Sequence, residues 1–252
     1  MTDQREKLKK AGAVLLLLLL WQGAAVLVGK KVLLASPLEV LRRMPSLAAE
    51  PGFLKTVGFS FLRIAAGFLS GFFAAVVLAV AAGRFSSVER ILSPLMVTVK
   101  TVPVASFIII ALIWFSSRNL SSFISFLMVL PVIYTGCLAG IRGIDRKELE
   151  MAKIFRLSFL KKLRFIWLPA METHIMSSAR TALGLSFKAG IAAEVIGIPD
   201  GSIGERLYEA KVYLETVDLF AWTVVIVVLS VLFEKAVTGF LRHCYRKLES
   251  YE

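Results

Sequence analysis

Long apolar runs recur along this 252-residue chain, and they constrain its fold more than any other feature. A helix needs about 20 mostly apolar residues to cross a bilayer. Hydrophobic residues make up 57% of the sequence and the mean hydropathy is +0.75, too apolar for a soluble domain of this length. We interpret six runs as membrane spans: 11–28, 64–82, 94–115, 121–140, 179–198 and 217–236. The sequence therefore predicts an all-α membrane protein with six transmembrane helices, forming a single transmembrane domain over residues 1–252.

The basic residues indicate how these spans are oriented. The chain has 30 Lys and Arg against 18 Asp and Glu, a net charge of +12. If the N-terminus is cytosolic, most of the cations outside the spans fall in inside segments, as the positive-inside rule expects. Lys30 and Lys31 make the first outer loop more basic than the rule prefers. We expect both termini inside, and no nucleic-acid binding, because no basic, aromatic-rich soluble domain is present.

The start of the chain resembles a signal peptide, with Lys9 and Lys10 before a leucine run. The apolar run extends to Val28 without an A-x-A cleavage site, so a retained first span is expected. His174 and His243 are the only histidines, and neither has a partner at ligand spacing. We therefore expect no metal site, and no catalytic residues, because the sequence has no cluster of nucleophiles or acids.

A polar, basic segment, residues 142–178, separates spans four and five. Asp145 is placed to cap a helix, and Glu148 three residues later suits a variant of the capping box. The helix would extend through Glu150, with Leu149, Ala152 and Phe155 on one apolar face.

Ser158 is placed to cap a second short helix, and Pro169 is expected to break the run before span five. The pattern predicts a helix-turn-helix that is too polar to insert and too short to fold alone. It must pack on its own membrane helices or on a soluble partner, unless it is a solvated linker on anionic headgroups. The pattern alone leaves these alternatives open.

Two motifs in this segment resemble a known family. Glu150-x-Ala152 and Ile166-x-Leu168-Pro169 stand at the spacing of the EAA motif of bacterial ABC importer permeases. Further blocks at Ser36–Leu41, Lys100–Pro103 and Ala192–Gly197 resemble the branch handling nitrate, sulfonate, taurine and related small solutes. The resemblance extends over nearly the whole chain.

The resemblance implies a non-catalytic permease of the bacterial cytoplasmic (inner) membrane that transports a small polar or anionic solute. Its segment 142–178 would form a cytosolic coupling helix-turn-helix on an ATP-binding-cassette ATPase subunit, which would bind ATP, so this chain would need no cofactor. A second permease subunit, identical or homologous, and an extracytoplasmic solute-binding protein are the other implied partners. The expected coupling residues are Glu150, Ala152, Phe155, Arg156, Leu157, Ser158, Ile166, Leu168 and Pro169.

Arg156 departs from the family pattern, which usually places glycine at this position. Glycine accepts the left-handed backbone of the turn between the two short helices, whereas arginine in that conformation costs on the order of 1 kcal/mol or more. Either the turn is redrawn here, or Arg156 makes a new contact with the partner.

Four residues are candidates for the translocation route: Lys100, Pro103, Lys188 and Glu194. Charges inside a membrane span generally mark function. Lys100 could instead snorkel to the inner surface, and Pro103 should interrupt span three. Lys188 is hypothesised to offer positive charge to the solute, its alternative being a structural pairing. Glu194 has the same alternative, or solvation at the interface.

Two other classes of protein compete with the permease interpretation. A secondary transporter commonly shows internal repeats and helices broken at the midplane, but no convincing repeat relates the two halves, and the basic segment 142–178 would be unexplained. A membrane-embedded enzyme would need clustered catalytic groups at a membrane face.

Overall fold

The computed structural model describes residues 2–249, and within that range the chain is helical with no β-strand. In chain order the helices are α1 (Thr2–Val28), α2 (Pro37–Ala48), α3 (Phe53–Arg84), α4 (Ser86–Thr101), α5 (Val104–Trp114), α6 (Ser117–Arg142), α7 (Arg146–Ile154), α8 (Phe159–Lys162), the π-helical turn η1 (Leu163–Trp167), α9 (Leu168–Gly197), α10 (Ile203–Val212) and α11 (Thr216–Glu249). The all-α prediction is confirmed.

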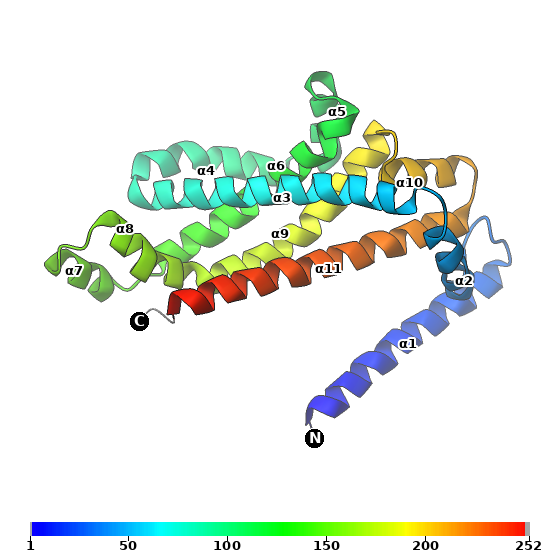
Figure 1. Cartoon of the computed structure of the whole chain (residues 1–252), viewed down its shortest axis with the longest axis horizontal. Coiled ribbons are helices and arrows are strands. Elements are labelled where there is room, and N and C mark those ends of the chain that lie inside the picture. The colour runs from blue at the N-terminus through cyan, green and yellow to red at the C-terminus, as the bar shows by residue number, and fades with distance from the viewer. Residues whose placement is uncertain (1, 250–252) are drawn as a thin grey trace.

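The long helices form a bundle along the longest axis of the molecule (Figure 1). α6 packs most extensively against α9 and α3, so these three helices form the centre of the core. The short helices α7 and α8 and the end of α11 lie at one end of the bundle, and α2 and α10 lie at the other (Figure 1). α1 projects away from the bundle, and its leucines at 15–20 are exposed.

Among residues 2–249, three helices are long and apolar enough to cross a membrane: α3, α6 and α11. The α4–α5 pair would make a fourth if it crosses as one span, and the apolar part of α1, Gly12–Val28, is shorter than this criterion requires. The 30-residue α9 is long enough, but Arg180, Lys188 and Glu194 lower its hydropathy. Length and composition therefore support three or four of the six predicted spans.

The predicted span 94–115 is not one straight helix. α4 already begins at Ser86, and the axes of α4 and α5 meet at 106° across Val102 and Pro103. Pro103 has no N–H to donate and disfavours helical backbone at the residue before it, and Val102 is extended (φ −72°, ψ 133°). The interruption expected at Pro103 is confirmed, and its size makes this element a broken span or a re-entrant loop.

The close packing of α3 on α6 depends on glycine. A Cβ added at Gly71 would lie 2.9 Å from the carbonyl oxygen of Phe126, and one at Gly67 would collide with the carbonyl of Ser122. Small residues four apart allow such close approach of helices. The Gly67-x-x-x-Gly71 pattern therefore marks a real helix contact, and its partner is α6.

Polar contacts join α2 to the start of α11 at the α2–α10 end. Ser36 caps α2 by accepting from the Glu39 amide, and the Glu39 carboxylate accepts from the Ser36 amide at 3.1 Å, which is a capping box. Further along α2, the Arg43 guanidinium makes a bidentate pair with Asp218 of α11, at 2.6 and 2.7 Å. Hydrogen bonding to Asp218 raises the pKa of Arg43. Two segments far apart in sequence are thereby held together.

Candidate functional site

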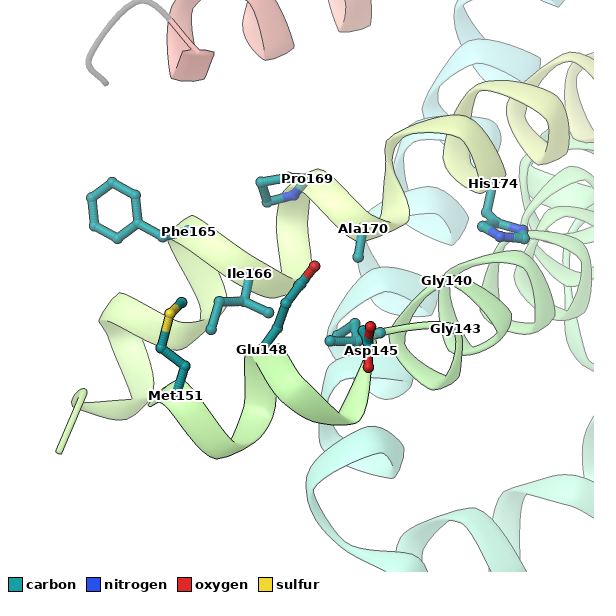
Figure 2. A pocket seen from close by; sticks show the side chains of 11 residues that line it. Gly140, Gly143, Asp145, Glu148, Met151, Phe165, Ile166, Pro169, Ala170 and His174 are labelled. Atoms are coloured by element: carbon teal, nitrogen blue, oxygen red, sulfur yellow. The ribbon is translucent and has the colours of Figure 1, made fainter. Parts of the chain in front are cut away.

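The site begins where α6 ends and α7 starts. The Asp145 side chain caps α7 by accepting from the Lys147 amide at 3.0 Å. Within the described structure Glu148 does not complete the expected capping box, and its carboxylate points toward the start of α9 instead (Figure 2). Ala152 is fully buried and Leu149 partly buried, so one face of α7 packs on the chain itself.

α7 ends in a turn that needs a left-handed residue, and Arg156 occupies it with φ +50°. The Leu157 amide donates to the Ala152 carbonyl at 3.0 Å, and the Arg156 amide donates to the Lys153 carbonyl at 3.0 Å. These two bonds define a Schellman motif, whose left-handed position is usually glycine. The turn is therefore retained rather than redrawn, with arginine in the strained position.

Leu149 and Ala152 pack on the chain, but Phe155 does not, although the sequence predicted one apolar face for all three. The helix ends at Ile154, and the Phe155 side chain beyond it is 71% exposed. Met151 and Ile154 are 50% and 78% exposed. These three residues, which we call the α7 apolar surface, are exposed hydrophobic side chains at the end of a helix that also exposes several charges.

The second short helix leads without a break into α9. The prediction that Pro169 breaks the helical run before span five is therefore wrong. Ser158 precedes α8, but within the described structure its hydroxyl makes no capping bond. The turn η1 then widens to π geometry, and the Leu168 amide donates to the Leu163 carbonyl five residues back. Pro169 follows in the first turn of α9, where a missing N–H is tolerated. Predicted span five therefore belongs to a helix beginning at 168 rather than 179.

η1 also holds this segment against the bundle. Ile166 and Trp167 are buried, and the Trp167 ring packs edge-on against Phe159 with ring centroids 5.8 Å apart. A Cβ at Gly83, near the end of α3, would lie 3.4 Å from the Trp167 ring, and the Arg84 guanidinium lies 5.8 Å from the centre of the Phe159 ring. The sequence analysis did not predict this contact. The signal available for it was the pair Phe159 and Trp167 on either side of the basic stretch 161–164.

A cavity of about 610 Å³ lies between α7, the end of α6 and the start of α9. Figure 2 shows Met151 and Glu148 reaching across it from α7, and Ile166 reaching back from η1. A Cβ at Gly140 would lie 2.8 Å from the Cα of Met171, so glycine there sets how closely α6 and α9 cross beside the cavity. The cavity separates α7 from the bundle on one side, although Ala152 anchors the helix.

The structure gathers the predicted coupling residues into one region with two different environments. Ala152 and Ile166 are buried, and Leu157 and Leu168 are partly buried. The remaining members are exposed: Glu150, Phe155, Arg156, Ser158 and Pro169. The buried members hold the segment on the bundle, while the exposed members form its outer surface.

The predicted route residues lie at the α4–α5 bend and on α9. Lys100 lies in the last turn of α4, and its Nζ donates to Thr135 Oγ1 of α6 at 3.2 Å, while Pro103 lies at the bend between α4 and α5. Lys188 is exposed on α9. Lys100 and Pro103 are thus neighbours along the chain at the bend, and Lys188 lies on a different helix.

Glu194 is fully buried and links three helices. Its Oε2 accepts from Ser60 Oγ of α3 at 2.6 Å and from the Gly204 amide of α10 at 3.3 Å. Ser60 Oγ in turn accepts from the Ile203 amide at 2.9 Å. The carboxylate thereby satisfies donors at the start of α10, as an N-cap does. Sequence reasoning singled out Glu194 but not Ser60 or Gly204, which lie far from it along the chain.

Comparison with known families assigns the class of this protein. Residues 67–249 match the family model for the binding-protein-dependent transport system inner membrane component. That match covers α6, α9 and the whole segment from α7 to η1, and the chain belongs to this family.

Individual relatives share a quarter of their residues with the chain over most of its length. The putative aliphatic sulfonates transport permease protein SsuC of Bacillus subtilis (strain 168) is 26% identical, covering 87% of this chain and 79% of the relative. The taurine transport system permease protein TauC of Escherichia coli (strain K12) is 24% identical, covering 88% and 83%. The nitrate import permease protein NrtB of Leptolyngbya laminosa is 25% identical, covering 76% and 71%.

Proposed function

We propose that this chain is the permease subunit of an ATP-binding-cassette importer, and that it forms the translocation route for a small polar or anionic solute. The observation that carries the proposal is the α7 apolar surface, Met151, Ile154 and Phe155, at the end of the molecule that also holds the end of α11 (Figure 1). The family match supports the class, and the names of the relatives support a sulfonate-, taurine- or nitrate-like solute.

The α7 apolar surface suits a protein partner better than lipid. Burying one large apolar side chain stabilises a complex by roughly 1.5–3 kcal/mol, so three together supply a substantial driving force. The same helix carries Arg146, Lys147 and Glu150, all exposed, and charges of both signs suit a mixed protein surface. The ATPase subunit is the proposed partner, with ATP bound there and not on this chain.

The proposed topology has six spans with both termini in the cytosol. α3, α6 and α11 meet the length and composition of a span, and α1, the bent α4–α5 pair and α9 would add three more. α9 is packed in the core by α6, which would shield its polar residues from lipid. The distribution of Lys and Arg supports this orientation. The chain would then be a multi-pass protein of the bacterial inner membrane.

Two further partners complete the proposed importer. Forming a closed route would take a second permease subunit, either a copy of this chain or a homologue. A separate extracytoplasmic solute-binding protein would deliver the solute, and the α2–α10 end would face it. On this proposal the chain is a non-catalytic subunit, and selectivity would be shared with the binding protein.

The test is co-purification of the full chain with its candidate ATPase subunit. Phe155→Glu should abolish the complex, because it introduces a charge into the α7 apolar surface. Tyr213→Glu is the matched control, since Tyr213 is 72% exposed at the opposite end of the molecule, and its complex should survive. Retention of the ATPase by Phe155→Glu would overturn the docking proposal, and solute uptake without any ATPase would favour a secondary transporter.

A further inference from the structure

A second polar cavity, of about 350 Å³, lies between α4 and α6 and includes the route candidate Lys100 in its lining. Its polar lining comes from both helices: Glu89, Ser93, Lys100, Tyr134, Thr135 and Arg142. Apolar residues complete the wall, among them Met96 and Leu138. A polar cavity of this size between two helices of a membrane bundle could hold a small molecule with a charged head.

The positive charge of Lys100 is not neutralised by the hydrogen bond that its ammonium group makes. Its Nζ donates to Thr135 Oγ1 at 3.2 Å, and that hydroxyl is neutral and itself donates to the Pro131 carbonyl at 2.8 Å. A lysine ammonium carries three N–H donors. Lys100 lies in the last turn of α4, so its ammonium is close to the carbonyl end of that helix.

Tyr134 provides a second, independent observation that favours a ligand in this cavity. The residue is 2% exposed and lines the cavity, yet within residues 2–249 its buried hydroxyl has no hydrogen-bond partner. A buried polar group without a partner costs on the order of 1–3 kcal/mol. Among residues 2–249, Ser121, Trp167 and Glu194 also keep such an atom, and Tyr134 is the one of the four that lines the cavity between α4 and α6. A ligand atom that accepts from its hydroxyl would remove the cost.

The remaining charges of the cavity compensate each other. Arg142 forms an ion pair with Glu89, whose carboxylate is the acidic group of the lining. Lys100 therefore leaves the cavity with a net positive charge. The ligand that matches one cation and hydroxyl donors is a monovalent oxoanion.

We propose that the cavity between α4 and α6 is an oxoanion subsite, in which Lys100 and Tyr134 bind the oxygens of a sulfonate, nitrate or phosphate group. The inference deepens the proposed transport function and rests on it for the solute, because the anion would be bound beside the bend at Pro103. The same chemistry would accept the phosphate of an anionic lipid headgroup, so a transported solute and a lipid are two possible sources of the anion.

The experiment measures anion binding by the purified importer complex in nanodiscs of the neutral lipid phosphatidylcholine. Ethanesulfonate is the probe, and dimethyl sulfone is its uncharged control. We expect saturable binding of ethanesulfonate only. Lys100→Met should weaken it at least about tenfold and Tyr134→Phe by several-fold, because each removes one donor. Lys55→Met, a substitution of an exposed lysine at the start of α3, should bind like the wild type.

Several outcomes decide the proposal. Unchanged ethanesulfonate affinity in both Lys100→Met and Tyr134→Phe would overturn it, as would equal binding of dimethyl sulfone. Tyr134→Phe keeps the test valid if Lys100→Met fails to assemble, because it removes only one oxygen. Adding phosphatidylglycerol to the nanodiscs distinguishes the two sources of the anion. The subsite binds a lipid headgroup if phosphatidylglycerol competes with ethanesulfonate and if native mass spectrometry finds the lipid on the wild type but not on Lys100→Met. It binds the solute if phosphatidylglycerol leaves ethanesulfonate binding unchanged.

Uptake by the same complex in liposomes separates this inference from the transport function. If uptake is absent while ethanesulfonate binding still depends on Lys100, the subsite stands and the transport proposal fails. If uptake persists and Lys100→Met changes neither uptake nor binding, the transport proposal stands and the subsite fails.

Discussion

The amide of Leu157 donates a hydrogen bond to the carbonyl of Ala152 at 3.0 Å, and this bond closes α7 with a Schellman turn. Both residues pack against the core, so the turn fixes the direction in which the α7 apolar surface faces. Arg156 lies inside the turn at φ +50°, where glycine would be unstrained.

Arg156→Gly should therefore stabilise the local fold. We expect α7 to gain about 1 kcal/mol against local opening, because the left-handed strain disappears. Arg156→Val should lose at least as much, since a β-branched residue fits that backbone worse. Hydrogen exchange of the amides of residues 149–157 measures both changes.

The same variant answers whether the arginine side chain contacts the ATPase. If Arg156→Gly protects α7 but lowers ATPase coupling in the complex, the side chain contributes to docking. If ATPase coupling in Arg156→Gly is unchanged or higher, the arginine side chain does not contribute to docking. Less protection in the glycine variant than in the wild type would contradict the strain argument.

Glycine at position 71 should be indispensable to the contact between α3 and α6. Gly71→Ala places a Cβ 2.9 Å from the Phe126 carbonyl, so the helices must separate, at a cost of roughly 1–3 kcal/mol. Gly58→Ala on the same helix meets nothing within 4 Å and should be neutral or slightly stabilising. Thermal unfolding in detergent compares them, and equal behaviour of the two variants would refute the packing argument.

Glu194 should act as a structural link. Glu194→Ala leaves the Ser60 hydroxyl and the Gly204 amide without their acceptor, so we expect a loss of about 1–3 kcal/mol and faster exchange at the start of α10. Lys188→Met, which replaces an exposed charge on the same helix, should leave α10 unchanged. Hydrogen exchange of residues 203–207 reports the difference. Equal protection in the alanine variant and the wild type would exclude the link.

The capping box of α2 should make the stability of the folded chain depend on pH. The Lys31 ammonium, and then the Ser36 amide and hydroxyl, lower the pKa of Glu39 from 4.5 to about 2. A lowered folded-state pKa contributes stability that is present above pH 4.5 and is lost as the pH falls toward 2. Glu39→Gln should therefore unfold at a lower temperature than the wild type at pH 7, and the gap should narrow at pH 3. A gap that is constant with pH would contradict the shift.

Local chemistry in the sequence was enough to predict much of this protein. Apolar runs gave the all-α class, because backbone groups in lipid must be satisfied within a helix. Asp145 caps the helix that it was expected to cap, and Pro103 interrupts its helix. Each of these signals acts within a few residues, so one sequence suffices to interpret it.

Longer-range features could not be obtained that way. Pro169 was expected to end a helix, but it lies in the first turn of α9, directly after the π turn at Leu163–Trp167. Phe155 was assigned by its spacing to one apolar face with Leu149 and Ala152, although the helix ends one residue earlier. Both errors concern where a helix stops, and packing of Trp167 and Leu157 on the bundle decides that.

The sequence by itself indicated the apolar helices, the cap at Asp145, the interruption at Pro103 and the family resemblance of segment 142–178. Tertiary structure alone decided that Arg156 keeps the left-handed turn, that Glu194 meets Ser60 and Gly204, and that Lys100 and Tyr134 share a cavity. The reason is physical: periodicity and capping act between neighbours in the chain, whereas burial and hydrogen-bond partners depend on how distant helices pack together.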